Sequence, residues 1–92
     1  MDLQQALSVN VDDIATEQQA SEAYRALFYP ADMEGYLDDA DPRFDSAGND
    51  ELPNVLAESA FNADQSGNST GSEVFNLMRQ LVVKFPGADF SA

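Results

Sequence analysis

The residues with the clearest chemical potential are carboxylates, and they are concentrated in one segment. From Asp32 to Glu51 the chain has eight acidic residues and one base, Arg43, for a net charge of −7. Clustered carboxylates attract cations and cationic side chains and repel phosphates. The segment therefore predicts a binding surface for a positively charged partner. The candidate partner-binding residues are Asp32, Glu34, Asp38, Asp39, Asp41, Asp45, Asp50 and Glu51.

The charge of the whole chain supports the same prediction. The 92 residues contain 17 Asp and Glu but only four Lys and Arg, which gives a formal net charge of −13. Duplex DNA carries about one negative charge per 1.7 Å of axis, so a protein dense in carboxylates can occupy a groove built for phosphate. In size and charge the chain resembles small phage-encoded inhibitors. We therefore predict that it binds a basic, nucleic-acid-binding surface of a partner protein by phosphate mimicry.

A structural role or an adaptation to salt would also account for the acidity. The same surface would suit a small structural or adaptor subunit of a virion or complex that bridges basic neighbours. Adaptation to high salt needs no partner, and it fits the 11 Asp against six Glu and the single lysine, Lys84. Direct binding to nucleic acid or to an anionic membrane is not expected, because both require Lys and Arg.

The composition argues against an enzyme. The chain has no histidine for acid–base catalysis near neutral pH and no cysteine nucleophile. It has no serine in a nucleophile elbow and no phosphate-binding glycine loop. We expect no catalytic residues and, in the main interpretation, no cofactor. The start of the chain lacks a signal-peptide pattern and no apolar run is long enough to span a bilayer, so a cytoplasmic location in the cell or host is expected.

A second chemical possibility lies in the polar run from Asn62 to Glu73. Oxygen-bearing side chains stand at its first, third, fifth and ninth positions, Gly67 at the sixth and Glu73 at the twelfth. With its flanking apolar residues, residues 52–81, this run resembles a single EF-hand, whose loop binds calcium through oxygen ligands. The resemblance implies Ca²⁺ as an alternative cofactor. The implied ligands are Asn62, Asp64, Ser66, Asn68 through its backbone, Thr70 and Glu73.

The same run also fits a hinge between two helices without metal. Only two of the implied ligands, Asp64 and Glu73, are charged, so the resemblance implies weak binding. The one candidate for a paired loop, Pro30 to Asp41, has Gly35 at the same sixth position but begins with proline and is not expected to bind calcium. In the hinge interpretation, Thr70 and Glu73 form a capping box at the start of a helix.

The elements that position these residues are predicted to be helical. Apolar residues recur with helical spacing in three stretches, residues 12–28, 51–61 and 72–85. A long acidic loop, residues 29–50, separates the first two. The expected fold is a single all-α domain, residues 1–92, with three main helices and a short additional turn over Leu3 to Leu7.

Local signals give the expected helix ends and the expected core. Asn10 or Asp12 is expected to cap the first helix, and Pro30 to end it. The last helix is apolar on more than one face, which predicts the central, most buried element. Four apolar residues in and next to the acidic loop are expected to pin it to the core or to anchor a partner. These are Met33, Tyr36, Leu37 and Phe44.

Overall fold

The computed structural model describes residues 2–91, and every regular element in this part of the chain is helical. The elements are α1 (Leu3–Leu7), the 3-10 helix η1 (Val11–Asp13), α2 (Glu17–Met33), α3 (Leu52–Gln65) and α4 (Ser69–Lys84). The prediction of an all-α fold with three main helices is confirmed, and so is the additional helical turn near the N-terminus. No helix among these residues combines the length and the apolarity that crossing a membrane requires.

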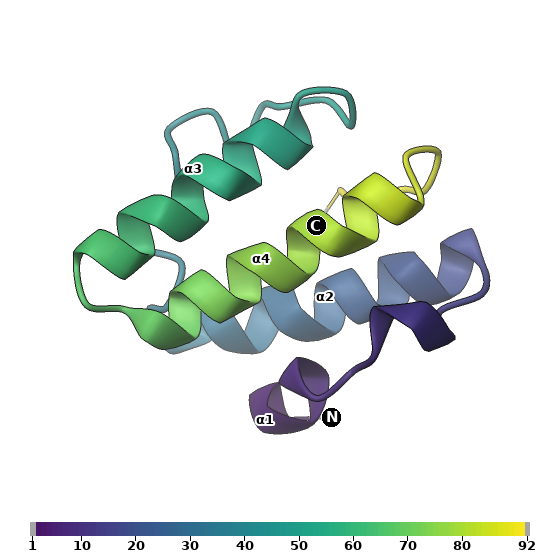
Figure 1. Cartoon of the computed structure of the whole chain (residues 1–92), viewed down its shortest axis with the longest axis horizontal. Coiled ribbons are helices and arrows are strands. Elements are labelled where there is room, and N and C mark those ends of the chain that lie inside the picture. Colours follow the sequence, from purple (N-terminus) through teal and green to yellow (C-terminus); the bar gives the residue numbers. More distant parts are fainter. Residues whose placement is uncertain (1, 92) are drawn as a thin grey trace.

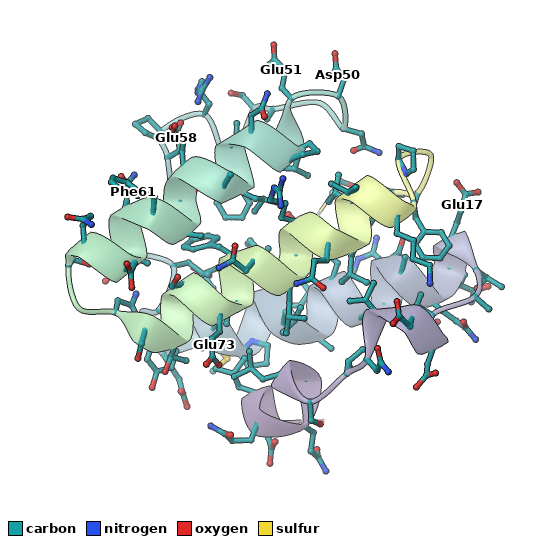
Figure 2. The ribbon with its side chains drawn as sticks, viewed as in Figure 1. Glu17, Asp50, Glu51, Glu58, Phe61 and Glu73 are labelled. Atoms are coloured by element: carbon teal, nitrogen blue, oxygen red, sulfur yellow. The ribbon has the colours of Figure 1, made fainter. Side chains whose placement is uncertain are left out.

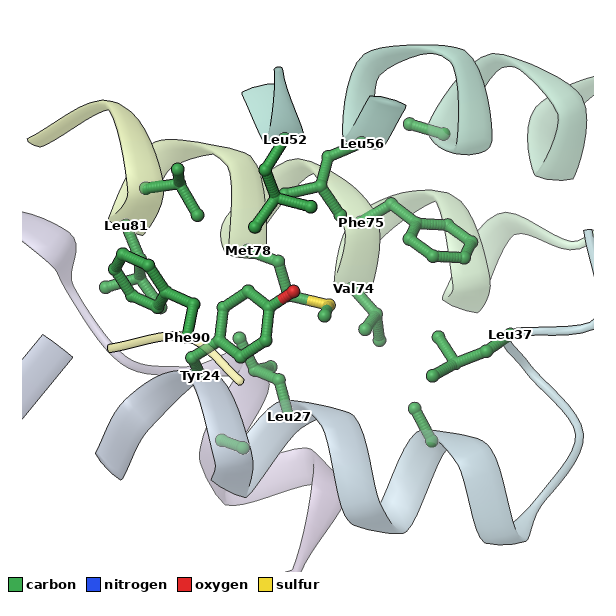
Figure 3. Packing of buried hydrophobic residues seen from close by; sticks show 14 of the residues in the cluster. Tyr24, Leu27, Leu37, Leu52, Leu56, Val74, Phe75, Met78, Leu81 and Phe90 are labelled. Carbon is green, nitrogen blue, oxygen red and sulfur yellow. The ribbon is translucent and has the colours of Figure 1, made fainter. Parts of the chain in front are cut away.

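Helix α4 is the central element, as its apolar faces predict. It contacts every other helical element, and Figure 1 shows it between α3 and α2, with α1 beside it. Side chains from α2 and α3 converge on it in the core (Figure 3). Its side chains without solvent exposure are Val74, Phe75, Met78 and Val82. Burying one such side chain stabilises the fold by about 1.5–3 kcal/mol, so α4 organises the core.

The predicted start of the first helix at residue 12 is wrong, because two caps compete there. Asn10 Oδ1 accepts a hydrogen bond from Asp12 N (3.0 Å) and caps only the single turn of η1. Thr16 caps the longer helix, since its Oγ1 accepts from Gln19 N (3.1 Å). Helix α2 therefore begins at Glu17, and the chain between the two caps is extended at Ile14.

The expectation that Pro30 ends the first helix is also wrong, because α2 continues through it to Met33. A proline inside a helix lacks the N–H that would bond four residues back. The missing bond would run back to the carbonyl of Ala26, so the disruption falls on the turn before Pro30, and residues 31–33 can stay helical. The next residue, Ala31, is fully buried, and its carbonyl accepts a hydrogen bond from Tyr36 N (2.9 Å). Burial and this terminal hydrogen bond hold the last turn in place.

Helices α2 and α3 end in the same way, at glycines with positive φ. Gly35 has φ of 80° and Gly67 has φ of 82°. Each follows the last turn of its helix, and the next residue's amide bonds back to a carbonyl in that turn. These bonds join Tyr36 N to Ala31 O (2.9 Å) and Asn68 N to Ala63 O (2.8 Å). This is the Schellman motif, which satisfies carbonyls left free at a helix end.

The predicted segment between the second and third helices is much shorter than expected. Helix α3 runs to Gln65 rather than residue 61, and α4 begins at Ser69 rather than residue 72. Gly71 suggests a loop in the sequence, but it lies inside α4 for a steric reason. A Cβ at this position would clash with the backbone carbonyl of Tyr36 and the side chain of Asn68.

The α2–α3 connection, residues 34–51, is a series of turns packed onto the core. It is shorter than the predicted loop, because residues 29–33 belong to α2. Leu37 is buried, while Tyr36 and Phe44 are half-buried against the core. The Phe44 ring lies 5.9 Å from the rings of both Phe28 and Phe75. Three of the four predicted apolar residues thus pack against the core, and the fourth, Met33, is 88% exposed.

Substitution of three glycines by alanine tests these backbone assignments. Gly→Ala inside a helix normally stabilises by about 1 kcal/mol, but Gly71→Ala should destabilise because of the clash with Tyr36 O. Gly67→Ala should cost about 1–2 kcal/mol because its φ is left-handed. Gly48→Ala is the matched control and should have little effect, since its φ is not positive and the nearest atom belongs to a flexible side chain. Urea unfolding measures the free energy of unfolding of all three variants. A Gly71→Ala variant more stable than the wild type would contradict the packing of α4.

Candidate partner-binding surface

All eight candidate carboxylates lie at the surface, but they do not form one cluster. Two of them, Asp39 and Asp41, are half-buried. The exposed six are Asp32, Glu34, Asp38, Asp45, Asp50 and Glu51. Because most of them sit on a connection that links the ends of two helices, they are spread along its path. The structure brings some of them together and separates others.

One group surrounds a shallow cleft between the end of α2 and the connection. Asp32, Asp41 and Asp45 line this cleft, which has a volume of about 250 Å³. Its apolar lining includes Phe28 and Phe44. Carboxylates and aromatic rings therefore meet at one surface, an arrangement that the sequence spacing alone did not reveal.

Asp39 has a structural role at the turn between α3 and α4. The Asn68 side-chain amide donates to Asp39 Oδ2 (3.1 Å) and to Tyr36 O (2.9 Å). Asn68 Oδ1 accepts from Gly71 N (2.9 Å), so the same side chain caps α4. One asparagine thus ties the acidic connection to the start of the central helix.

Asp41 is also held by its own chain. Its backbone N–H donates to Ser59 Oγ (2.8 Å), which is buried on α3. Arg43 donates to both of its carboxylate oxygens, from Nε (3.0 Å) and from Nη2 (3.2 Å). These hydrogen bonds hold the pKa of Asp41 below its usual range. Asp39 and Asp41 therefore help to fix the connection, and the other six carboxylates remain for a partner.

At the other end of the connection, Asp50 and Glu51 project outward where α3 begins (Figure 2). Glu58 lies farther along the same edge of α3 (Figure 2) and was not among the candidates. The seven-residue spacing from Glu51 to Glu58 places both on one side of a helix. That spacing could have identified Glu58, which lies outside the densest acidic stretch.

Three of the four bases of the chain form contacts within it, and the fourth, Arg79, is exposed. The only lysine, Lys84, donates from Nζ to the backbone carbonyls of Val11 and Ile14 (2.8 Å each) and so holds η1 against the end of α4. Arg25 donates to the carbonyl of Ser91 (3.3 Å) and lies 3.9 Å from the carboxylate of Asp89. Within residues 2–91, Lys84 therefore neutralises no carboxylate, and Arg25 has one distant ionic contact.

Most of the negative charge is consequently left without a partner. All 17 acids and all four bases lie within residues 2–91, and only Asp41 and Asp89 form ion pairs there. Subtracting these two from 17 leaves fifteen carboxylates unpaired within the described chain. Charges of one sign that are not neutralised locally sum to a long-range field that attracts cationic surfaces.

The implied calcium ligands do not form a calcium loop. Their run is mostly helical, and a three-residue turn, residues 66–68, joins α3 to α4. Asn62 and Asp64 lie on α3, Ser66 and Asn68 on the turn, and Thr70 and Glu73 on α4. Across residues 2–91, no group of three or more His, Cys, Asp or Glu side chains could hold a metal ion. The calcium site remains a prediction to which this conformation lends no support.

Two helix ends explain why glycine stands at the sixth position of both candidate loops. Gly67 and Gly35 occupy equal positions in the two candidate loops because each terminates a helix with positive φ. The predicted capping box of Thr70 and Glu73 is wrong, since α4 begins earlier and is capped by Asn68.

Comparison with known proteins gives no relative from which a role could be transferred. No protein-family model, no curated protein and no solved structure matches this chain.

The unpaired charge predicts how stability responds to salt. Self-repulsion among fifteen carboxylates destabilises the compact state, and salt screens it. Between about 0.01 M and about 1 M NaCl the Debye length falls from about 30 Å to about 3 Å. Relief of about 1 kcal/mol would raise Tm by about 4–8 °C. Circular dichroism melts measure this, and KCl should give the same rise as NaCl. An unchanged or lower Tm in salt would contradict the charge argument.

Proposed function

We propose that this chain is a non-enzymatic, acidic protein-interaction module that binds a basic, nucleic-acid-binding surface of a partner by mimicking phosphates. The observation that carries the proposal is the internal use of three of the four bases, Arg25, Arg43 and Lys84. Lys84 bonds backbone carbonyls, and Arg43 bonds the carboxylate of Asp41 within the connection. The remaining carboxylates are therefore free to pair with a partner's Lys and Arg.

The density of charge is close to that of a nucleic acid. The longest dimension of the molecule is 33 Å. Duplex DNA of that length carries about 19 charges at one per 1.7 Å. The net charge of −13 is about two-thirds of that figure. A groove that attracts DNA would therefore attract this protein by the same long-range force.

Charge alone gives limited affinity. A surface ion pair contributes about 0–1 kcal/mol, because both charges are already well solvated. Charge complementarity mainly speeds association and sets specificity, whereas buried apolar anchors supply most of the binding energy. The exposed apolar side chains Met33 (88% exposed) and Phe61 (60%), and the cleft beside Phe28 and Phe44, offer such anchors.

Two triple variants test the proposal with equal changes of charge. Asp32→Asn, Asp38→Asn and Asp45→Asn together remove three exposed, unpaired carboxylates from the candidate surface. Asp12→Asn, Asp13→Asn and Glu17→Gln remove three exposed carboxylates near the opposite end of α2. Asp39 and Asp41 are left unchanged, because their loss would also disturb the fold.

The readout is binding of each variant to a basic protein captured from host lysate, measured by calorimetry at several salt concentrations. The first triple variant should bind about tenfold more weakly, as expected for three lost surface pairs, and should depend less on salt. The second should bind nearly as the wild type does. Equal affinities and equal salt dependence for all three proteins would contradict the proposal.

A further inference from the structure

A second, larger cleft lies between the acidic connection and the C-terminal tail, residues 88–91. Its volume is about 370 Å³, within the size range of small ligand sites. Its aromatic lining consists of Tyr24, Phe28, Phe44 and Phe90. The cleft shares Phe28, Phe44 and Asp45 with the shallow cleft described above. It is therefore continuous with the proposed partner surface.

The wall formed by the tail is built and held by specific contacts. Ser21 Oγ donates to Asp89 O (2.6 Å), and Asn49 Nδ2 donates to Ala88 O (2.7 Å). The rings of Tyr24 and Phe90 lie 5.0 Å apart, and Figure 3 shows them side by side in the core. Because Asn49 belongs to the connection, it also links the two walls of the cleft.

Tyr24 lines this cleft, and its hydroxyl has no hydrogen-bond partner among the described residues, 2–91. The residue as a whole is 2% exposed. Burial raises the pKa of Tyr24 above its usual range, so the hydroxyl stays neutral and can accept a hydrogen bond as well as donate one.

Among the described residues that line the cleft, one carboxylate is available to a cation. Asp89 already accepts from Ser91 N (3.0 Å) and Ser91 Oγ (2.6 Å), with Arg25 3.9 Å away. Asp45, on the opposite wall, is exposed and forms no ion pair within residues 2–91. A cation would therefore approach on the side of Asp45, away from Arg25.

We propose that this cleft receives one aromatic side chain with a polar tip, tryptophan or tyrosine, from the basic partner, while a neighbouring lysine or arginine pairs with Asp45. The inference rests on the proposed function, because it names the anchor that charge alone does not supply. An aromatic side chain can pack against Phe44 and Phe90, and its polar tip can bond the Tyr24 hydroxyl. Such a partner matches both the aromatic lining and the acidic rim.

Two blocked pentapeptides of equal charge serve as probes. One is lysine-arginine-tryptophan-arginine-lysine, and in the other alanine replaces the tryptophan. Calorimetry at low salt gives the affinity of each for the whole chain, and amide shifts in NMR spectra locate the binding. The tryptophan peptide should bind about fivefold more tightly, within the range of measured aromatic pair energies, and should shift amides around Phe44 and Phe90.

Three variants test whether the cleft, rather than another part of the surface, binds the tryptophan side chain. Ala47→Leu places a larger side chain in the cleft lining and should abolish the advantage of tryptophan. Ala57→Leu adds the same volume at an exposed site on α3 and should leave the advantage of tryptophan unchanged. Tyr24→Phe keeps the ring and removes only the unpartnered hydroxyl, so the fold should persist. It should reduce the advantage about threefold, as loss of one hydrogen bond predicts.

Equal affinity of the two peptides for the wild type would overturn this inference, and so would a tryptophan advantage that survives Ala47→Leu. In either case, saturable and salt-sensitive binding of the alanine peptide would leave the proposed function standing. Absence of such binding for both peptides would contradict the proposed function itself.

Discussion

The shortage of cations is the constraint on which the rest of this structure depends. With four bases and 17 acids, ion pairs cannot hold the chain together, and unpaired charge opposes compaction. Apolar packing must therefore supply the stability, and it is concentrated on α4, which contacts every other helical element. Lys84 reaches carbonyls about 70 residues away, of Val11 and Ile14, and so stabilises the N-terminal segment without consuming a carboxylate.

The same constraint shapes the acidic connection. A segment this rich in carboxylates would repel itself away from the core unless other groups held it. Neutral side chains do this: Asn68, Ser59 and Asn49 each bond the backbone of a distant segment. Leu37 and Phe44 add apolar contacts from inside the connection. The carboxylates are thus presented from an ordered framework, which lowers the entropy that a partner would have to remove on binding.

The sequence predicted the helices well and their ends poorly. Apolar periodicity identified three helices and the central position of the last, because that pattern reflects burial directly. Pro30 and Gly71 were misleading because tertiary contacts override their local preferences. Gly67 was misleading because a helix end and a calcium loop both favour glycine at a sharp turn. Gly71 is needed because α4 approaches the Tyr36 carbonyl, and no local pattern reveals a contact across 35 residues. The acidic surface was visible in composition, but the use of the bases and the aromatic clefts depends on long-range packing.

Competition with DNA tests the central claim most directly. The partner captured from lysate is bound to a labelled DNA duplex, and this protein is added in increasing amounts at fixed salt. Phosphate mimicry predicts displacement of the duplex, with an apparent Kd for this protein that rises in proportion to the DNA concentration. A ternary complex of partner, duplex and this protein, with an apparent Kd independent of DNA, would contradict the claim.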